Sequence, residues 1–151
     1  MKTKALIVIL LFNLLAACQA FPPEPINAAT DTEITLSAGQ TVTITDANIS
    51  ITFIAVSGDD RCPSEIECAM SEPVTIDLSI QDKDGTVFEE ALQTFTDSTG
   101  LAPTREFEGI KSSVIVDNYL IKIIGVLPYP KDRSSSIKTS EYFVTMKVTK
   151  N

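Results

Sequence analysis

The sequence predicts an all-β protein, an antiparallel β-sandwich of the immunoglobulin-like kind with about 8 to 9 strands and one loop closed by a disulfide. Two observations lead to this prediction. After Glu33, short runs rich in Val, Ile, Thr, Phe and Tyr show apolar residues with a period of two. Turn-forming segments such as Lys83-Asp84-Gly85 and Asp117-Asn118 separate these runs, and no stretch shows the apolar spacing of a long helix.

Residues 1–17 have the organisation of an export signal, with a basic start, an apolar run over residues 5–15 and small residues at the end. The run is shorter than the about 20 apolar residues that a transmembrane helix needs. The last part, Leu15-Ala16-Ala17-Cys18, resembles the lipobox of bacterial lipoproteins, in which the Cys is acylated and becomes the mature N-terminus. The resemblance implies lipidation of Cys18. A secretory signal cleaved after Ala20 is the alternative.

An acylated Cys18 would tether the protein to a membrane while the folded part stays in water. An Asp after this Cys resembles a signal for the inner membrane. Gln19 stands there instead, which favours the outer membrane, facing the periplasm, in an organism with two membranes. With a single membrane, the protein would lie on the outer face of the cell. Residues 18–32 are rich in Pro, which predicts an extended tether, and the sandwich is expected over residues 33–151.

The strands differ in how clearly the sequence marks them. Residues 74–80 alternate strictly between apolar and polar side chains, as a half-buried strand does. In residues 49–56 the same alternation places Ala55 on the buried face and Val56 on the other. Residues 119–127 are apolar on both faces, which indicates a central strand. In chain order, strands are predicted over residues 33–36, 42–44, 49–56, 74–80, 86–95, 104–110, 112–116, 119–127 and 142–148.

The composition excludes several classes of function. Lys2 and Lys4 are two of the 12 basic residues, so 10 remain against 20 acidic residues once the signal is removed. This balance argues against nucleic acid as a partner. The chain has no His, which excludes Ser-His-Asp and Cys-His catalysis. We therefore expect no catalytic residues and no cofactor, although a carboxylate pair such as Glu89 with Glu90 is the basis of an enzymatic alternative.

Lipidation of Cys18 would leave Cys62 and Cys68 to form a disulfide in an oxidising compartment. Closing so short a loop contributes about 2 kcal/mol. A redox pair is the alternative, but such pairs are usually separated by two residues, and the neighbouring Glu65 and Glu67 raise a thiol pKa. A zinc site would need further Cys or His ligands.

The segment before this loop carries a longer motif. Phe53-x-x-Val56-x-x-Asp59-Asp60-Arg61-Cys62-Pro63, followed by Cys68, resembles the Asp-x-Arg-Cys-Pro-x4-Cys motif of uncharacterised bacterial lipoproteins and secreted β-sandwich domains. The resemblance covers residues 53 to 80, with support from Leu127-Pro128-Tyr129-Pro130. It implies a β-sandwich with a disulfide-closed loop, and it brings no established activity. That family usually has Trp and Gly where this chain has Met70 and Glu72.

The charged residues of this loop form the predicted interaction site, because loops at the ends of sandwiches commonly carry function. Acidic loops can hold Ca²⁺, but they are usually solvated and a surface pair of Arg61 contributes little, so no metal is expected. We expect a membrane-anchored extracytoplasmic lipoprotein with a binding or structural role and an unknown protein partner. The alternative is an inhibitor of an exported protease that uses the constrained loop. The predicted interaction residues are Asp59, Asp60, Arg61, Glu65 and Glu67.

Overall fold

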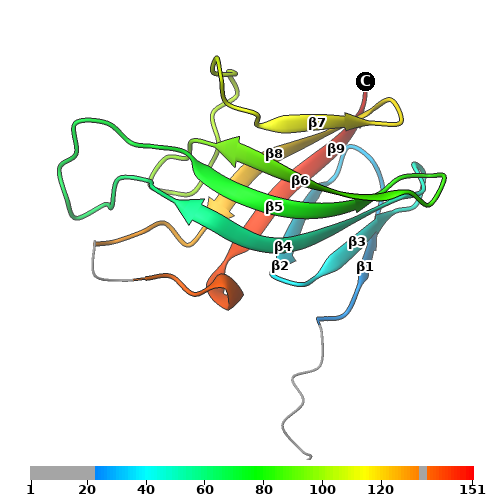
Figure 1. Cartoon of the computed structure of the whole chain (residues 1–151), viewed down its shortest axis with the longest axis horizontal. Coiled ribbons are helices and arrows are strands. Elements are labelled where there is room, and N and C mark those ends of the chain that lie inside the picture. Colours follow the sequence, from blue (N-terminus) through cyan, green and yellow to red (C-terminus); the bar gives the residue numbers. More distant parts are fainter. Residues whose placement is uncertain (1–22, 133–135) are drawn as a thin grey trace, which may run out of the picture.

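The computed structural model describes residues 23–132 and 136–151, and the described chain is an all-β sandwich (Figure 1). Nine strands form two sheets around one core, which confirms the predicted fold class. Cys18 and the predicted signal peptide lie outside the described residues. Within the described part, no helix has the length and apolarity needed to cross a membrane. Among the residues described, the single helical element is a 3₁₀ turn, η1 (Thr139–Glu141).

The larger sheet has the strand order β1-β3-β4-β5-β6, and the smaller sheet has the order β2-β9-β8-β7. Neighbouring strands are antiparallel except that β1 runs parallel to β3. The larger sheet contains β1 (Ile26–Ala28), β3 (Thr41–Ile44), β4 (Ile49–Asp59), β5 (Val74–Gln81) and β6 (Val87–Thr94). The smaller sheet contains β2 (Glu33–Ser37), β7 (Ser113–Val116), β8 (Tyr119–Leu127) and β9 (Phe143–Lys150).

The sandwich begins earlier than the sequence predicts, because β1 lies within the stretch expected to be tether. Ile26 pairs with Val42 and Ala28 pairs with Ile44 on β3. Both Ile26 and Ala28 pack against the core, and this burial explains why so short a strand forms. The predicted boundary at residue 33 is therefore corrected.

The strand predicted over residues 104–110 is absent, and this segment is a loop. Gly109 has a φ of 79°, outside the strand region, and the Ile110 N–H donates to the Phe107 carbonyl at 3.1 Å to close a turn. The Phe107 ring packs against Phe95, with 4.8 Å between ring centroids. Phe107 thus packs against the residue that follows β6, and the segment adds no strand.

The core consists of apolar side chains that alternate along the strands of both sheets and meet between them. Val74, Ile76, Leu78 and Ile80 of β5 are fully buried, as the alternation of residues 74–80 predicts. Among the described residues, no buried side-chain nitrogen or oxygen lacks a hydrogen-bond partner. The largest fully buried side chains are Leu36, Ile44, Ile49, Ile51, Phe53, Ile76, Leu78, Ile80, Leu92, Ile121, Ile123 and Met146.

Candidate functional site

The spacing of three in Phe53-x-x-Val56-x-x-Asp59 has a structural cause in β4. The β4–β5 ladder is irregular twice, between Phe53 and Ala55 and between Val56 and Gly58, and each irregularity adds one residue to β4. Phe53, Val56 and Asp59 therefore oppose Leu78, Ile76 and Val74, which are alternate buried residues of β5.

The two bulges change which side chains face the core. Ala55 pairs with Asp77, on the outer face of the sheet, whereas Val56 packs against the core. The facing predicted for Ala55 and Val56 is thus reversed, because the sequence shows no sign of the first bulge. The second bulge turns Asp59 inward, opposite the buried Val74.

Arg61 follows two residues later, and its side chain is buried between the sheets, with 2% of the residue exposed. The guanidinium binds Asp59 through two bonds, from Nε to Oδ1 at 2.7 Å and from Nη2 to Oδ2 at 2.6 Å. Nη1 donates to the Thr96 hydroxyl at 3.1 Å and to the Val126 carbonyl at 3.0 Å. Nη2 also donates to the Pro128 carbonyl at 2.9 Å. All five N–H donors of Arg61 are therefore used.

Two tyrosines complete this arrangement. The Tyr142 hydroxyl donates to Asp59 Oδ2 at 2.8 Å. The Arg61 guanidinium carbon lies 5.0 Å from the centroid of the Tyr129 ring, and the Tyr129 hydroxyl donates to the Cys62 carbonyl at 2.7 Å. We call Asp59, Arg61, Thr96, Tyr129 and Tyr142 the Arg61 centre. It joins the end of β4 in the larger sheet to β8 and the start of β9 in the smaller one.

The electrostatics of the Arg61 centre favour a charged Asp59 and a neutral Tyr142. Burial by itself raises the pKa of Asp59, but the hydrogen bonds and charge of Arg61, with the Tyr142 hydroxyl, outweigh it and hold that pKa below 3.8. Burial and the hydrogen bond to Asp59 raise the pKa of Tyr142 far above its ordinary value. The centre therefore keeps one ion pair across the neutral pH range.

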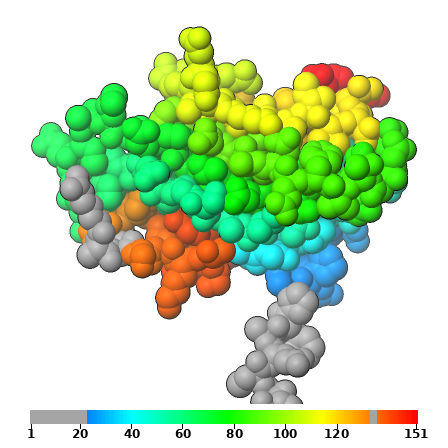
Figure 2. Space-filling model, in the orientation of Figure 1, coloured from blue at the N-terminus to red at the C-terminus, as the bar shows by residue number. Residues whose placement is uncertain are grey.

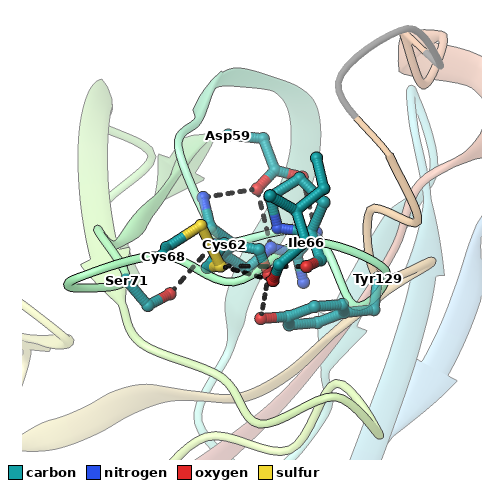
Figure 3. Close-up of a disulfide and its surroundings, with 8 residues drawn as sticks. Asp59, Cys62, Ile66, Cys68, Ser71 and Tyr129 are labelled. Carbon is teal, nitrogen blue, oxygen red and sulfur yellow. Dashed lines mark hydrogen bonds and ion pairs between the residues drawn. A yellow bond between two sulfur atoms is a disulfide. The ribbon is translucent and has the colours of Figure 1, made fainter.

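The Arg61 centre lies next to the disulfide loop, which we define as residues 62–72. Figure 3 shows Asp59 and Tyr129 of the centre beside the disulfide. Cys62 and Cys68 form a disulfide with 6.0 Å between their Cα atoms, as predicted. The Cys62 N–H donates to the Ser71 hydroxyl at 3.1 Å, and the Glu72 N–H donates to the Asp60 carbonyl at 3.3 Å. The two ends of the loop are thereby held together.

The middle of the disulfide loop is bound to the segment after β8. The Ser64 N–H donates to the Pro130 carbonyl at 3.0 Å, and the Glu65 N–H donates to the Lys131 carbonyl at 2.9 Å. The Ile66 N–H closes a turn onto the Pro63 carbonyl at 3.1 Å. The backbone is therefore fixed by bonds that leave the side chains of this stretch unused.

The side chains of the disulfide loop point largely to solvent, and the loop extends beyond the ends of β4 and β5 (Figures 1 and 2). Glu65, Glu67 and Glu72 are exposed, as is Asp60 beside the loop. Met70, which stands where the resembling family has Trp, is 78% exposed. The loop thus presents one large apolar side chain among carboxylates.

The structure divides the five predicted interaction residues into two groups. Asp60, Glu65 and Glu67 are exposed on or beside the loop, whereas Arg61 is buried and Asp59 is partly buried with it. The expectation of a solvated Arg61 pair is wrong, because the bulges of β4 direct Asp59 inward.

From the sequence, Thr96, Tyr142 and Met70 are not assigned to the site, and Tyr129 is noted only within the segment Leu127-Pro128-Tyr129-Pro130 that supports the resemblance. The one available signal is the placement of Tyr129 between two prolines, which restricts its backbone and thus its direction. Thr96 and Tyr142 contact the centre only through the tertiary fold.

Over residues 23–132 and 136–151, no three Cys or acidic side chains converge in a geometry that could hold a metal ion. Comparison of the chain with known protein families, with curated proteins and with solved structures finds no match. The function is therefore inferred from the geometry of the chain itself.

Proposed function

We propose that the protein is a membrane-tethered extracytoplasmic lipoprotein that binds a protein partner through its disulfide loop and has no catalytic role. The tether is proposed from the lipobox-like sequence ending at Cys18. The observation that carries the binding role is Met70, a large apolar side chain 78% exposed on a backbone fixed by a disulfide and several hydrogen bonds.

A fixed loop loses little conformational entropy when it binds, which favours affinity. Methionine is enriched at protein interfaces, because its flexible thioether adapts to irregular surfaces. The carboxylates of Glu65, Glu67 and Glu72 surround this apolar point with negative charge. The partner we propose therefore has an apolar pocket with basic residues at its rim.

The alternative of a protease inhibitor has less support from the loop geometry. An inhibitor that mimics a substrate pairs its extended backbone with the enzyme. The N–H groups of Ser64, Glu65 and Ile66 already bond to carbonyls of this chain, and residues 63–66 form a turn. These backbone hydrogen bonds leave the side chains of the loop available to bind a partner.

A photo-crosslinking residue in place of Met70 tests the binding role in cells that make the full chain. We expect one partner to be crosslinked reproducibly at position 70. Val87, which is 61% exposed at the other end of β5 and β6, is the matched control and should give no such product. The paired change Glu65→Lys and Glu67→Lys should abolish the crosslink, whereas Glu106→Lys and Glu108→Lys should not. Absence of a product at position 70, or equal products at both positions, would contradict the proposal.

A further inference from the structure

The outer face of the smaller sheet carries a groove of about 490 Å³. No residue of the disulfide loop lines this groove. This volume is in the range of small-molecule sites. The floor of the groove is formed by outward side chains of β2, β8 and β9, and the strand register shows which of them are neighbours. Gly125, Thr145 and Thr35 lie side by side in one row, and the next charged row contains Lys122, Lys147 and Glu33.

One wall of the groove is a segment bound to the edge of β8. The Val126 N–H donates to the Gly100 carbonyl at 2.8 Å, and the Ala102 N–H donates to the Ile124 carbonyl at 2.9 Å. Leu101, between them, pairs with Gly125 and is 60% exposed. Because Gly125 has no side chain, this segment approaches β8 closely, and the Gly100 carbonyl oxygen lies 3.2 Å from the place that a Cβ of Gly125 would take. This wall is fixed and apolar.

Two further large apolar side chains lie on the same outer face, outside the lining of the groove. Leu127 pairs with Phe143, and each is 48% exposed on the outer face. Leu101, Leu127 and Phe143 are thus three large apolar side chains gathered on one face of the described chain. Exposed apolar clusters of this kind mark binding surfaces.

The polar groups of the groove favour an anion. Lys122 and Lys147 line it, and neither makes an ion pair within the described part of the chain. The hydroxyls of Thr35 and Thr145 bond to each other at 2.9 Å. Glu33 is the one carboxylate of the lining, so the two ammonium groups leave a net positive charge.

We propose that this groove binds a small amphiphile with one carboxylate head group and a single apolar chain, of the fatty-acid class. The carboxylate would lie between Lys122 and Lys147, where charge-assisted hydrogen bonds are strongest. The chain would contact Leu101, Ala102 and Ile124. This site is separate from the disulfide loop, and the proposal does not depend on the protein-binding role.

Titration calorimetry of the full chain with dodecanoate, below its micelle-forming concentration, tests the proposal. We expect saturable binding at one site and weaker binding of the uncharged dodecanol. The paired change Lys122→Gln and Lys147→Gln should weaken dodecanoate binding about tenfold or more without altering the melting temperature. Lys138→Gln with Lys150→Gln removes the same charge outside the lining and should leave binding unchanged. Thr145→Trp, which fills the floor from the outer face, should also prevent binding.

Several results would overturn this inference. Equal binding by all variants would indicate adsorption of the amphiphile to the surface in general. Absence of saturable dodecanoate binding, together with binding of a short peptide of alternating Glu and Leu, would assign the groove to a peptide. Sedimentation that shows a dimer dissociated by the Thr145→Trp change would assign it to a second copy of the chain.

Discussion

Arg61 does at one end of the sandwich what apolar side chains do elsewhere, since it fills the space between the sheets and contacts both. Burying its charge is costly, and the cost is offset only because Asp59 neutralises it and every N–H donor has an acceptor. A buried pair of this kind adds little to stability over a well-packed apolar pair. Removing one partner, however, leaves a buried charge alone.

Arg61→Ala should therefore destabilise the protein by about 3–5 kcal/mol, because it leaves the Asp59 carboxylate without its counter-ion. Urea unfolding followed by circular dichroism measures the change. Arg105→Ala is the matched control. Arg105 is exposed and its guanidinium carbon lies 4.4 Å from the Phe107 ring centroid, so its loss should cost about 1 kcal/mol or less. Similar losses for the two variants would refute the assigned role.

Asp59 should make stability depend on pH in the acid range. Its folded-state pKa lies below the ordinary value, so its contribution is present above about pH 4 and is lost as the pH falls through the folded-state pKa. In Asp59→Asn, stability should fall less steeply below about pH 4 than in the unchanged protein. Thermal unfolding at a series of pH values measures this.

Asp97 provides the comparison for that experiment. The hydrogen bond from the Thr99 side chain, with backbone N–H groups, also lowers the pKa of Asp97, but this group is exposed and screened by solvent. Asp97→Asn should therefore change the acid slope less than Asp59→Asn. The opposite order would show that the acid sensitivity arises outside the Arg61 centre.

At the scale of the elements, the strands with a clear apolar pattern are the ones that the sequence predicts well. Residues 74–80, predicted from their alternation, correspond to β5 (Val74–Gln81). Residues 119–127, predicted from a run that is apolar on both faces, correspond to β8 (Tyr119–Leu127). The strand β1 and the bulges of β4 were not predicted, because each depends on pairing with another segment of the chain. Three residues of β1 show too little alternation to distinguish a strand from a tether.

The segment beside β8 depends on Gly100, which has a φ of 83° and lies against Leu127 and the Val126 carbonyl. A Cβ there would lie 2.6 Å from Leu127 Cδ2 and 2.7 Å from the Val126 oxygen. Gly100→Ala should cost about 3 kcal/mol or more, through backbone strain and the clash together. Chemical denaturation provides the measurement.

Gly109→Ala separates these two contributions. Gly109 has a similar φ of 79°, and a Cβ there would meet nothing within 4 Å. Its replacement should cost about 1–2 kcal/mol from the backbone alone. If the two variants are equally stable, the close approach at Gly100 does not hold the segment in place.

At the scale of the whole molecule, the sequence indicates which segment forms the candidate site, but it does not indicate how the residues of that segment are arranged. The motif around Cys62 and Cys68 lies at the end of the sandwich where β4 ends and β5 begins. Its division into a buried Arg61 centre and an exposed loop was not predictable, since Thr96, Val126 and Tyr142 come from other strands and loops. Residue type alone indicated charge at Asp59 and Arg61, and charge is usually solvated.

Replacing Cys18 tests how the whole molecule is attached. Cys18→Ser should move the protein from the membrane fraction to the soluble fraction with an unchanged melting temperature, because acylation at this residue is the proposed anchor. Cell fractionation and immunoblotting measure the distribution. The paired change Cys62→Ser and Cys68→Ser should leave the protein in the membrane fraction. Membrane attachment that persists in Cys18→Ser would exclude the anchor.

The way in which the disulfide loop is held has a consequence for how the protein can evolve. The bonds at Ser64, Glu65, Ile66 and Glu72 come from the main chain, and they do not depend on which side chain is present. Mutations of Glu65, Glu67 or Met70 should therefore leave the loop conformation and the sandwich intact, whereas Ser71 is needed for its hydrogen bond from the Cys62 N–H. The outward side chains of the loop can therefore vary without disturbing the Arg61 centre beneath it.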